Sequence, residues 1–308
     1  MGGGSWTTTA YSVYADSRGC SVDAMGCLTS SVTGACMDSA STSQIFHQRT
    51  LDESLSPVNV MRECCDTEEH PETIPVILAL DVTGSMGQTA VQVAAKLNQL
   101  MTKLYAEVKD IEFMVMGIGD LAYDNHPIQI SQFESDIRIA EALDKIYMEF
   151  GGGSNPYESY TAAWYMGAYH TKLDCWTRGK RGILITMGDE CLNPYLPEAE
   201  LKRVLQSDQL GETETSKLFG EAISKFRLYH INVHHREYMQ DRIKETWTQW
   251  IQADRFKSVK LDEVVDTIVE IIKTAIQEQA AAEAARPLTN VSAENSTVQL
   301  NEFGEVVW

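Results

Sequence analysis

The sequence has 308 residues and a formal net charge of −19 at pH 7, from 25 Lys and Arg against 44 Asp and Glu. This length suffices for one domain of about 200 residues with extensions at its ends. The acidic balance, with no compensating basic run, argues against a nucleic-acid backbone or an anionic membrane surface as the partner.

The cysteines and the apolar runs bear on where the protein works. The seven cysteines are odd in number and lack C-x-x-C spacing, so the sequence predicts neither a disulfide framework nor a zinc ribbon. No apolar stretch approaches the roughly 18 residues that span a bilayer, and no basic segment followed by an apolar one marks a secretory signal. We therefore expect a cytoplasmic protein with reduced thiols.

The chain divides into three parts by composition. Residues 1–72 comprise a Ser-, Thr- and Gly-rich arm without persistent periodicity and a polar connector from residue 56. We expect this arm to be irregular, either ordered against the domain through Trp6, Tyr11 and Tyr14 or disordered. Residues 73–285 form the predicted domain, and residues 286–308 form a mostly polar tail.

Within the predicted domain, apolar strand patterns alternate with amphipathic helix patterns. Strands are predicted at residues 75–80, 111–118, 127–133, 182–186, 228–233 and 256–261. Helices are predicted at residues 88–108, 137–150, 160–173, 197–205, 216–226, 240–252 and 262–285. This alternation predicts an α/β fold with a doubly wound, mostly parallel sheet and helices on both faces.

The most informative stretch is PVILALDVTGSMG, residues 75–87. A buried strand pattern ends at Asp81, and Thr83 and Ser85 follow at alternating positions before the next helix. One carboxylate and two hydroxyls are hard oxygen donors, which suit Mg²⁺ or Mn²⁺. Because ligands gather at the carboxyl ends of parallel strands, we also expect Asp120, Ser154 and Asp189 on the same rim.

The motif DVTGSM resembles the metal-ion-dependent adhesion site (MIDAS) of von Willebrand factor A (vWA) domains, and the resemblance extends over about residues 73–280. The chain looks closest to intracellular bacterial vWA proteins that begin MGGGSW and carry strings such as DCW..RGKRG and GDE. The resemblance implies a further ligand from a later loop, where Ser154 in the GGGS turn takes the place of the family's threonine. The family's last aspartate position holds Met187, so Asp189, in the next turn, is the expected substitute, with Asp120 as another carboxylate of the inner or outer shell.

The resemblance implies that the cation accepts a carboxylate from a partner protein, which would make this chain a metal-dependent protein-binding module rather than an enzyme. The residues do not separate Mg²⁺ from Mn²⁺ or Ca²⁺. Two alternatives stay open: a Mg²⁺-dependent phosphoesterase and a structural subunit of a larger assembly. The sequence lacks a D-x-D motif, a phosphate-binding P-loop and a dinucleotide fingerprint, which disfavours the first alternative.

Three other features have two interpretations each. Glu158 is either a further ligand or an acid in the first turn of the helix predicted from residue 160, and we favour the second. The histidines of YHINVHH, residues 229–235, are either zinc ligands or surface and satisfied core side chains, and we favour the second. Trp247 and Trp250 either stack a ligand or pack inward, and we expect inward packing.

Overall fold

The computed structural model of the chain describes residues 4–149, 156–234 and 239–285. Its centre is a six-stranded sheet in the order β12-β11-β9-β4-β5-β6. All neighbouring strands run parallel except β6, which is antiparallel to β5. The strands are β4 (Ile74–Asp81), β5 (Ile111–Ile118), β6 (Ile128–Ile130), β9 (Gly182–Gly188), β11 (Phe226–Val233) and β12 (Phe256–Val259).

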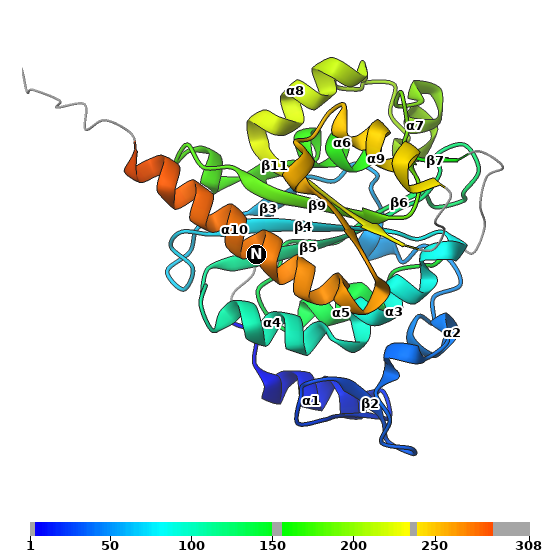
Figure 1. Cartoon of the computed structure of the whole chain (residues 1–308), viewed down its shortest axis with the longest axis vertical. Helices are drawn as coiled ribbons and strands as arrows, with labels where there is room; N and C mark the ends of the chain where they lie inside the picture. Colours follow the sequence, from blue (N-terminus) through cyan, green and yellow to red (C-terminus); the bar gives the residue numbers. More distant parts are fainter. Residues whose placement is uncertain (1–3, 150–155, 235–238, 286–308) are drawn as a thin grey trace, which may run out of the picture. The chain divides into compact units, whose positions relative to one another are not determined.

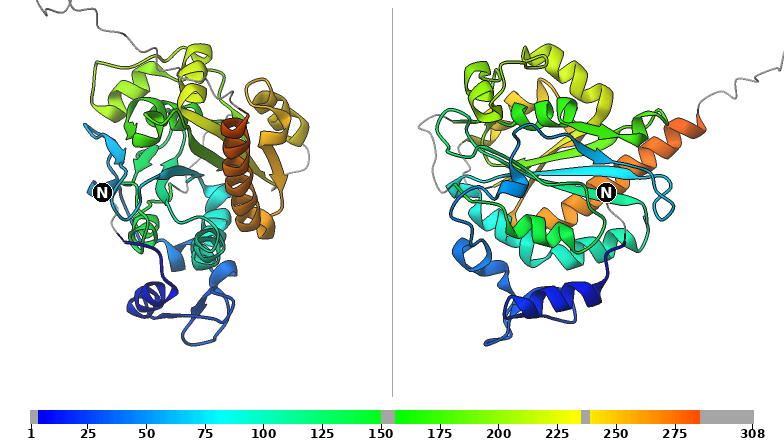
Figure 2. Two further views of the ribbon diagram at one scale, coloured as in Figure 1. Left: turned by 90° about the vertical axis from the view of Figure 1, so that its left-hand side faces the viewer. Right: turned by 180° about the vertical axis from the view of Figure 1, so that it is seen from behind.

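The central strands are apolar because helices cover the sheet on both faces (Figures 1 and 2). The first face carries α3 (Gly87–Ala95), α4 (Leu97–Tyr105), α5 (Arg138–Asp144) and α10 (Val264–Ala284). The second face carries α6 (Thr161–Tyr169), α7 (Glu198–Leu205), α8 (Thr215–Lys225) and α9 (Gln240–Thr248). The predicted doubly wound α/β class is thus confirmed.

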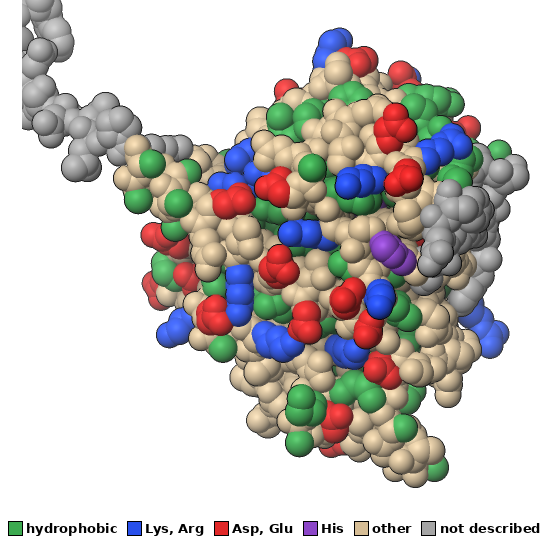
Figure 3. Space-filling model, viewed as in Figure 1, with side chains coloured by type: hydrophobic (Ala, Val, Ile, Leu, Met, Phe, Trp, Pro, Cys, Tyr) green, Lys and Arg blue, Asp and Glu red, His purple; other side chains and the backbone are tan. Residues whose placement is uncertain are grey.

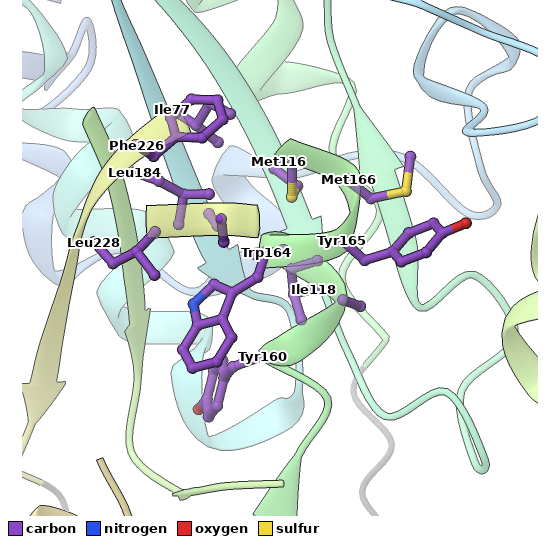
Figure 4. Close-up of a cluster of buried hydrophobic side chains, with 14 of the residues drawn as sticks. Ile77, Met116, Ile118, Tyr160, Trp164, Tyr165, Met166, Leu184, Phe226 and Leu228 are labelled. Carbon is purple, nitrogen blue, oxygen red and sulfur yellow. The ribbon is translucent and has the colours of Figure 1, made fainter. Parts of the chain in front are cut away.

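The core of the second face is built around α6, whose side chains are buried from Thr161 to Ala168. Figure 4 shows Trp164 and Tyr160 beside the strand residues Leu184 and Leu228. The Trp164 ring lies 6.2 Å from the Trp247 ring and 6.5 Å from the Trp250 ring, between centroids. The predicted inward packing of both tryptophans is therefore confirmed.

On the first face, α10 buries an apolar stripe that includes Val265, Ile268 and Ile272. Its polar side makes ion pairs with neighbouring elements, from Lys103 to Asp266 and from Lys273 to Glu107. Lys and Arg side chains lie among Asp and Glu side chains on the side of the molecule shown in Figure 3. The described residues from Ile276 onward form the last turns of α10 and count as a unit of their own. None of the described helices is both long and apolar enough to cross a bilayer.

The N-terminal arm differs from the irregular segment that we expected. It contains a helix, a short hairpin and a helical turn: α1 (Thr8–Ser17), β1 (Cys20–Val22), β2 (Leu28–Ser30) and α2 (Thr42–Ile45). The Thr7 hydroxyl caps α1 by accepting from the Ala10 N–H at 3.1 Å. Only Tyr11 and Ala15 of α1 are buried, so the helix shows too little apolar periodicity to be predicted.

Contacts with the first helical layer hold this arm in place. The Trp6 indole N–H donates to Asn98 Oδ1 at 2.9 Å, and the Tyr11 hydroxyl donates to the Ala94 carbonyl at 3.4 Å. The ordered alternative for the arm is therefore the correct one. Cys27, directly before β2, forms a disulfide with Cys36 in the segment after β2. This disulfide corrects the expectation of reduced thiols throughout.

Several predicted boundaries also change. The helix predicted at 88–108 breaks at Lys96 into α3 and α4. The helix predicted at 160–173 ends at Tyr169, because the residues that follow form β8 (Thr171–Leu173), which pairs with β3 (Arg62–Cys64) from the predicted polar connector. A second short pair joins β7 (Tyr157–Glu158) to β10 (Cys191–Leu192). Such strands of two or three residues depend on distant partners and leave no periodic signal.

Candidate functional site

The candidate site lies where the strand order reverses. From β4 the chain moves outward through β5 to β6, then returns to β9 on the other side of β4. The loops that follow β4 and β9 therefore flank the crevice in which doubly wound sheets bind ligands. Asp81 ends β4 and Asp189 directly follows β9. The sheet thus brings the two acids, far apart in the sequence, to one place.

Asp81 is 1% exposed and is held by three donors. Its Oδ1 accepts from the Thr83 N–H at 2.9 Å and from the Thr83 hydroxyl at 2.5 Å, and its Oδ2 accepts from the Tyr160 hydroxyl at 2.8 Å. Burial raises the pKa of Asp81 to about 7, the Thr83 bonds oppose this rise, and the nearby Asp189 adds to it. Within the described residues Asp81 has no Lys or Arg partner.

Ser85 connects the two loops. Its hydroxyl donates to Asp189 Oδ1 at 3.0 Å, although the residues are far apart in the sequence. Met187 is fully buried within β9, between Leu80 and Ile231 on the neighbouring strands. The acid that meets the D-x-T-x-S loop is therefore Asp189, as the sequence suggested.

Asp120 belongs to a separate turn at the end of β5. Its Oδ1 accepts from the Ala122 N–H at 2.8 Å, and its own N–H donates to Asp124 Oδ2 at 2.7 Å. No hydrogen bond between Asp120 and Asp81, Thr83 or Ser85 is found in the described part of the chain. Ser154, the predicted loop ligand, lies outside the described residues.

Glu158 is a buried acid that interacts electrostatically with both Asp81 and Asp120. Burial raises its pKa well above the usual value, and the negative charges of Asp81 and Asp120 raise it further. Glu158 is 6% exposed and belongs to β7, where its backbone pairs with Leu192. The expectation of an acid in the first turn of a helix is therefore wrong, because Glu158 is buried in the strand pair before α6 begins.

Tyr160 is a residue of the site that the sequence did not reveal. Besides donating to Asp81, its ring lies so close to Gly188 that a Cβ at that glycine would stand 1.7 Å from the Tyr160 hydroxyl oxygen. The pairing of a helix-start tyrosine with a strand-end glycine carries no local motif. Only the three-dimensional arrangement reveals it.

His230 supports the same region from inside the core. Its ring stacks on Trp247 with 3.7 Å between centroids, and its Nδ1 lies 2.9 Å from the Thr186 hydroxyl. Complete burial holds the pKa of His230 well below its usual value. The preferred reading of a core histidine is confirmed for His230, and His234 is exposed. His235 lies outside the described residues.

The donor set fits a hard cation that is held largely by hydroxyls. The described residues contain no group of three or more His, Cys, Asp or Glu side chains arranged to hold a metal ion. Two carboxylates, Asp81 and Asp189, instead meet two hydroxyls, from Thr83 and Ser85. Hard divalent cations take such oxygen ligands. A cation would also offset the repulsion between the two buried acids that raises the pKa of Asp81.

The strand order and the helices on both faces define a doubly wound α/β domain, in which a D-x-T-x-S loop follows the central strand. No protein-family model matches the sequence, and no curated protein matches it. Among solved structures, the chain is similar to the pilus adhesin SpaC from Lactobacillus rhamnosus GG in its open conformation, at 14% identity and a TM-score of 0.45. That match covers 72% of this chain and 31% of SpaC, so the chain spans about a third of the adhesin's length.

Two further structures are similar over about two thirds of this chain. The vWF domain of the type V pili tip protein Mfa5 from Porphyromonas gingivalis is 11% identical, with a TM-score of 0.43 and coverage of 67% of this chain and 96% of that one. Proximal thread matrix protein 1 from the mussel byssus, solved with a zinc-occupied MIDAS motif, is 13% identical, with a TM-score of 0.42 and coverage of 69% and 48%.

Proposed function

We propose that this protein is a metal-dependent protein-binding module that uses Asp81, Thr83, Ser85 and Asp189 to hold a divalent cation. Ser154 and Asp120 are the remaining candidates for the inner or outer shell. Mg²⁺ is the expected ion, with Mn²⁺ and Ca²⁺ as the other choices. The partner offers an acidic side chain.

The bond from Ser85 to Asp189 is the observation that carries this proposal. It brings a hydroxyl from the loop after β4 into contact with a carboxylate from the loop after β9, at the crevice where the strand order reverses. Thr83 and Tyr160 meanwhile fix the orientation of the Asp81 carboxylate through directed hydroxyl bonds. A site whose ligands are already oriented loses less entropy when it binds an ion.

The chemistry of a hydroxyl-rich shell favours recognition of an anion. When bound, a divalent cation with few carboxylate ligands retains positive charge and exchangeable water, so a carboxylate can take one coordination position. The hydroxyls of Thr83 and Ser85 contribute oxygens without adding charge. The chain's negative net charge slows the encounter with an acidic partner, but screening over about 8 Å at physiological salt limits that effect.

Thermal or chemical unfolding with Mg²⁺, Mn²⁺, Ca²⁺ or EDTA tests the metal site. At a hundredfold excess over the dissociation constant, a bound ion should add about 2.7 kcal/mol to the free energy of unfolding. Asp81→Ala should abolish this gain. Glu112→Gln is the matched control, since Glu112 is also a buried acid of the sheet, and it should keep the gain.

Pull-down with and without chelator then tests recognition. Partner capture that requires the ion and is lost in Asp81→Ala supports the binding module. Absence of any ion-dependent stabilisation in the natural sequence would contradict the proposal. Turnover of a phosphoester that disappears in Asp81→Ala would favour the hydrolytic alternative instead.

A further inference from the structure

A surface hollow lies beside the proposed metal site, between three segments that follow or form strands. Its lining includes Asp120 and Tyr123 after β5, Tyr157 and Glu158 of β7, and Tyr195 after β10. Asp120 and Glu158 form its acidic side, and the three tyrosines form its aromatic side. Apart from Asp120, a candidate for the inner or outer shell of the cation, these residues are not part of the proposed metal site.

The walls of the hollow are tied to one another. Glu158 and Leu192 pair between β7 and β10, and the Leu121 N–H donates to the Ser159 hydroxyl at 3.1 Å. The Asn193 side chain accepts from the Thr161 N–H at 3.1 Å and donates to the Tyr195 carbonyl at 2.8 Å. The hollow is therefore already formed in the free protein, which lowers the cost of binding.

The acids of the hollow are almost completely enclosed. Asp120 and Glu158 are each 6% exposed, and Glu158 Oε2 has no hydrogen-bond partner among the described residues. Leaving a buried carboxylate oxygen without a donor is unfavourable, and a charged donor compensates most strongly. Glu158 Oε2 can therefore accept a hydrogen bond from a group that enters the hollow.

The aromatic rings beside these acids point to the nature of that donor. Tyr123 is 59% exposed and Tyr195 is 66% exposed, so both rings are accessible to a ligand in the hollow. Aromatic faces next to carboxylates bind ammonium and guanidinium groups. Tyr157 already shows this chemistry within the chain, since the Arg242 guanidinium lies 5.5 Å from its ring centroid and donates to its hydroxyl at 2.9 Å.

We propose that this hollow binds a Lys or Arg side chain of a protein partner, through Glu158, Asp120 and the exposed faces of Tyr123 and Tyr195. The chain's net charge of −19 favours the approach of a basic partner. If the proposed function holds, the same partner presents an acidic residue to the cation and a basic residue to the hollow. The preferred partner sequence then contains an Asp or Glu close to a Lys or Arg.

Immobilised synthetic peptides can test this with the full chain as the soluble component. The peptides have a Gly-Ser background and carry one Asp alone, one Lys or Arg alone, or Asp with Lys or Arg at spacings of one to five residues. Binding is measured in Mg²⁺ and in EDTA. Peptides with both residues at the best spacing should bind roughly fivefold to tenfold more tightly than versions in which Gln replaces the basic residue.

Two variants test whether the tighter binding of peptides with a basic residue depends on the hollow. Glu158→Gln and Tyr195→Ala should each remove most of the gain from the basic residue and keep the Mg²⁺-dependent binding of Asp-only peptides. Tyr195 is exposed, so its variant should fold even where Glu158→Gln does not. Glu68→Gln removes the same charge at an exposed position elsewhere and should bind as the natural sequence does.

The results separate the two proposals. If Asp-only peptides bind with Mg²⁺ and the basic residue makes no difference, the inference about the hollow is wrong and the metal-dependent function stands. If basic peptides bind through Glu158 while Asp and Mg²⁺ have no effect, the hollow is supported and the metal-dependent function is wrong. If no peptide binds, both are overturned.

Discussion

Asp81 and Glu112 are buried carboxylates on the neighbouring strands β4 and β5, at opposite ends of the sheet. Asp81 pairs with the last residue of β5, whereas Glu112 pairs with Pro75 near the start of β4. Burial raises the pKa of each to about 7. Their hydrogen-bond partners, however, are different.

Three donors from Thr83 and Tyr160 orient the Asp81 carboxylate, and a second acid lies beside it. Glu112 instead interacts with the Cys64 thiol, and its Oε1 has no hydrogen-bond partner among the described residues. Burial alone therefore does not identify a functional acid. The supply of directed hydroxyls and the location at the reversal of strand order distinguish Asp81.

Among the substitutions that test the surroundings of Asp81, Gly188→Ala should have the largest effect on stability. The added Cβ would overlap the Tyr160 hydroxyl and ring, so the tyrosine has to move away from Asp81. Overpacking and the lost buried hydrogen bond together should lower the free energy of unfolding by about 4 kcal/mol. Denaturant unfolding measures this change.

Gly220→Ala is the matched control for that experiment. Gly220 lies in α8, and a Cβ there meets nothing within 4 Å. Since alanine favours the helix, the control should gain up to about 1 kcal/mol. Equal stability of Gly188→Ala and the natural sequence would mean that Tyr160 is not clamped between Gly188 and Asp81.

Glu112→Gln tests the buried acid at the other end of the sheet, through the pH dependence of the free energy of unfolding. Because burial raises the pKa of Glu112 from 4.5 to about 7, the folded state holds the proton more tightly than the unfolded state. The stability contributed by the protonated acid is fully present below about pH 4.5 and is lost as the pH rises through about 7. Over that interval the natural sequence should lose about 3 kcal/mol more than the variant.

Denaturant titrations at several pH values measure this difference, and Asp81 contributes equally to both proteins. Parallel pH profiles for Glu112→Gln and the natural sequence would show that Glu112 ionises normally in the folded protein.

The long elements of the fold could be predicted from the sequence, and the short ones could not. Strand β5 and helix α7 are within a residue of their predicted ranges, because continuous apolar runs and helical spacing are strong local signals. Strands β3 and β7 contain only two or three residues, and each exists because a distant segment lies beside it. Helix α1 likewise depends on Thr7 as its cap and on packing against the first helical layer.

The candidate site was predictable to the same extent. Asp81, Thr83 and Ser85 form a contiguous motif, and Asp189 follows an obvious strand, so the rule for parallel sheets placed them together. Tyr160 and the burial of Glu158 depend on the pairing of β7 with β10, which the sequence did not indicate. The sequence therefore did not reveal the bond from the Tyr160 hydroxyl to Asp81, although Tyr160 is the first residue of a predicted helix.

Tyr160→Phe should have the smallest effect on stability, and it should specifically lower the affinity for Mg²⁺. The change keeps the ring against Gly188 and removes only the hydroxyl that donates to Asp81 Oδ2 at 2.8 Å. Loss of one buried hydrogen bond should cost about 1 kcal/mol of unfolding free energy. Groups that orient a ligand typically change metal affinity by 10- to 100-fold, so Mg²⁺ affinity measured by calorimetry should fall about tenfold.

Tyr165→Phe separates orientation of Asp81 from a general loss of packing in α6. Its hydroxyl accepts from the Gly211 N–H at 2.9 Å and lies on the same helix, but it does not bond to Asp81. This control should show a similar cost in stability with unchanged Mg²⁺ affinity. If Tyr160→Phe binds Mg²⁺ as tightly as the control, the Tyr160 hydroxyl does not prepare Asp81 for a cation, and the two Thr83 bonds alone distinguish Asp81 from Glu112.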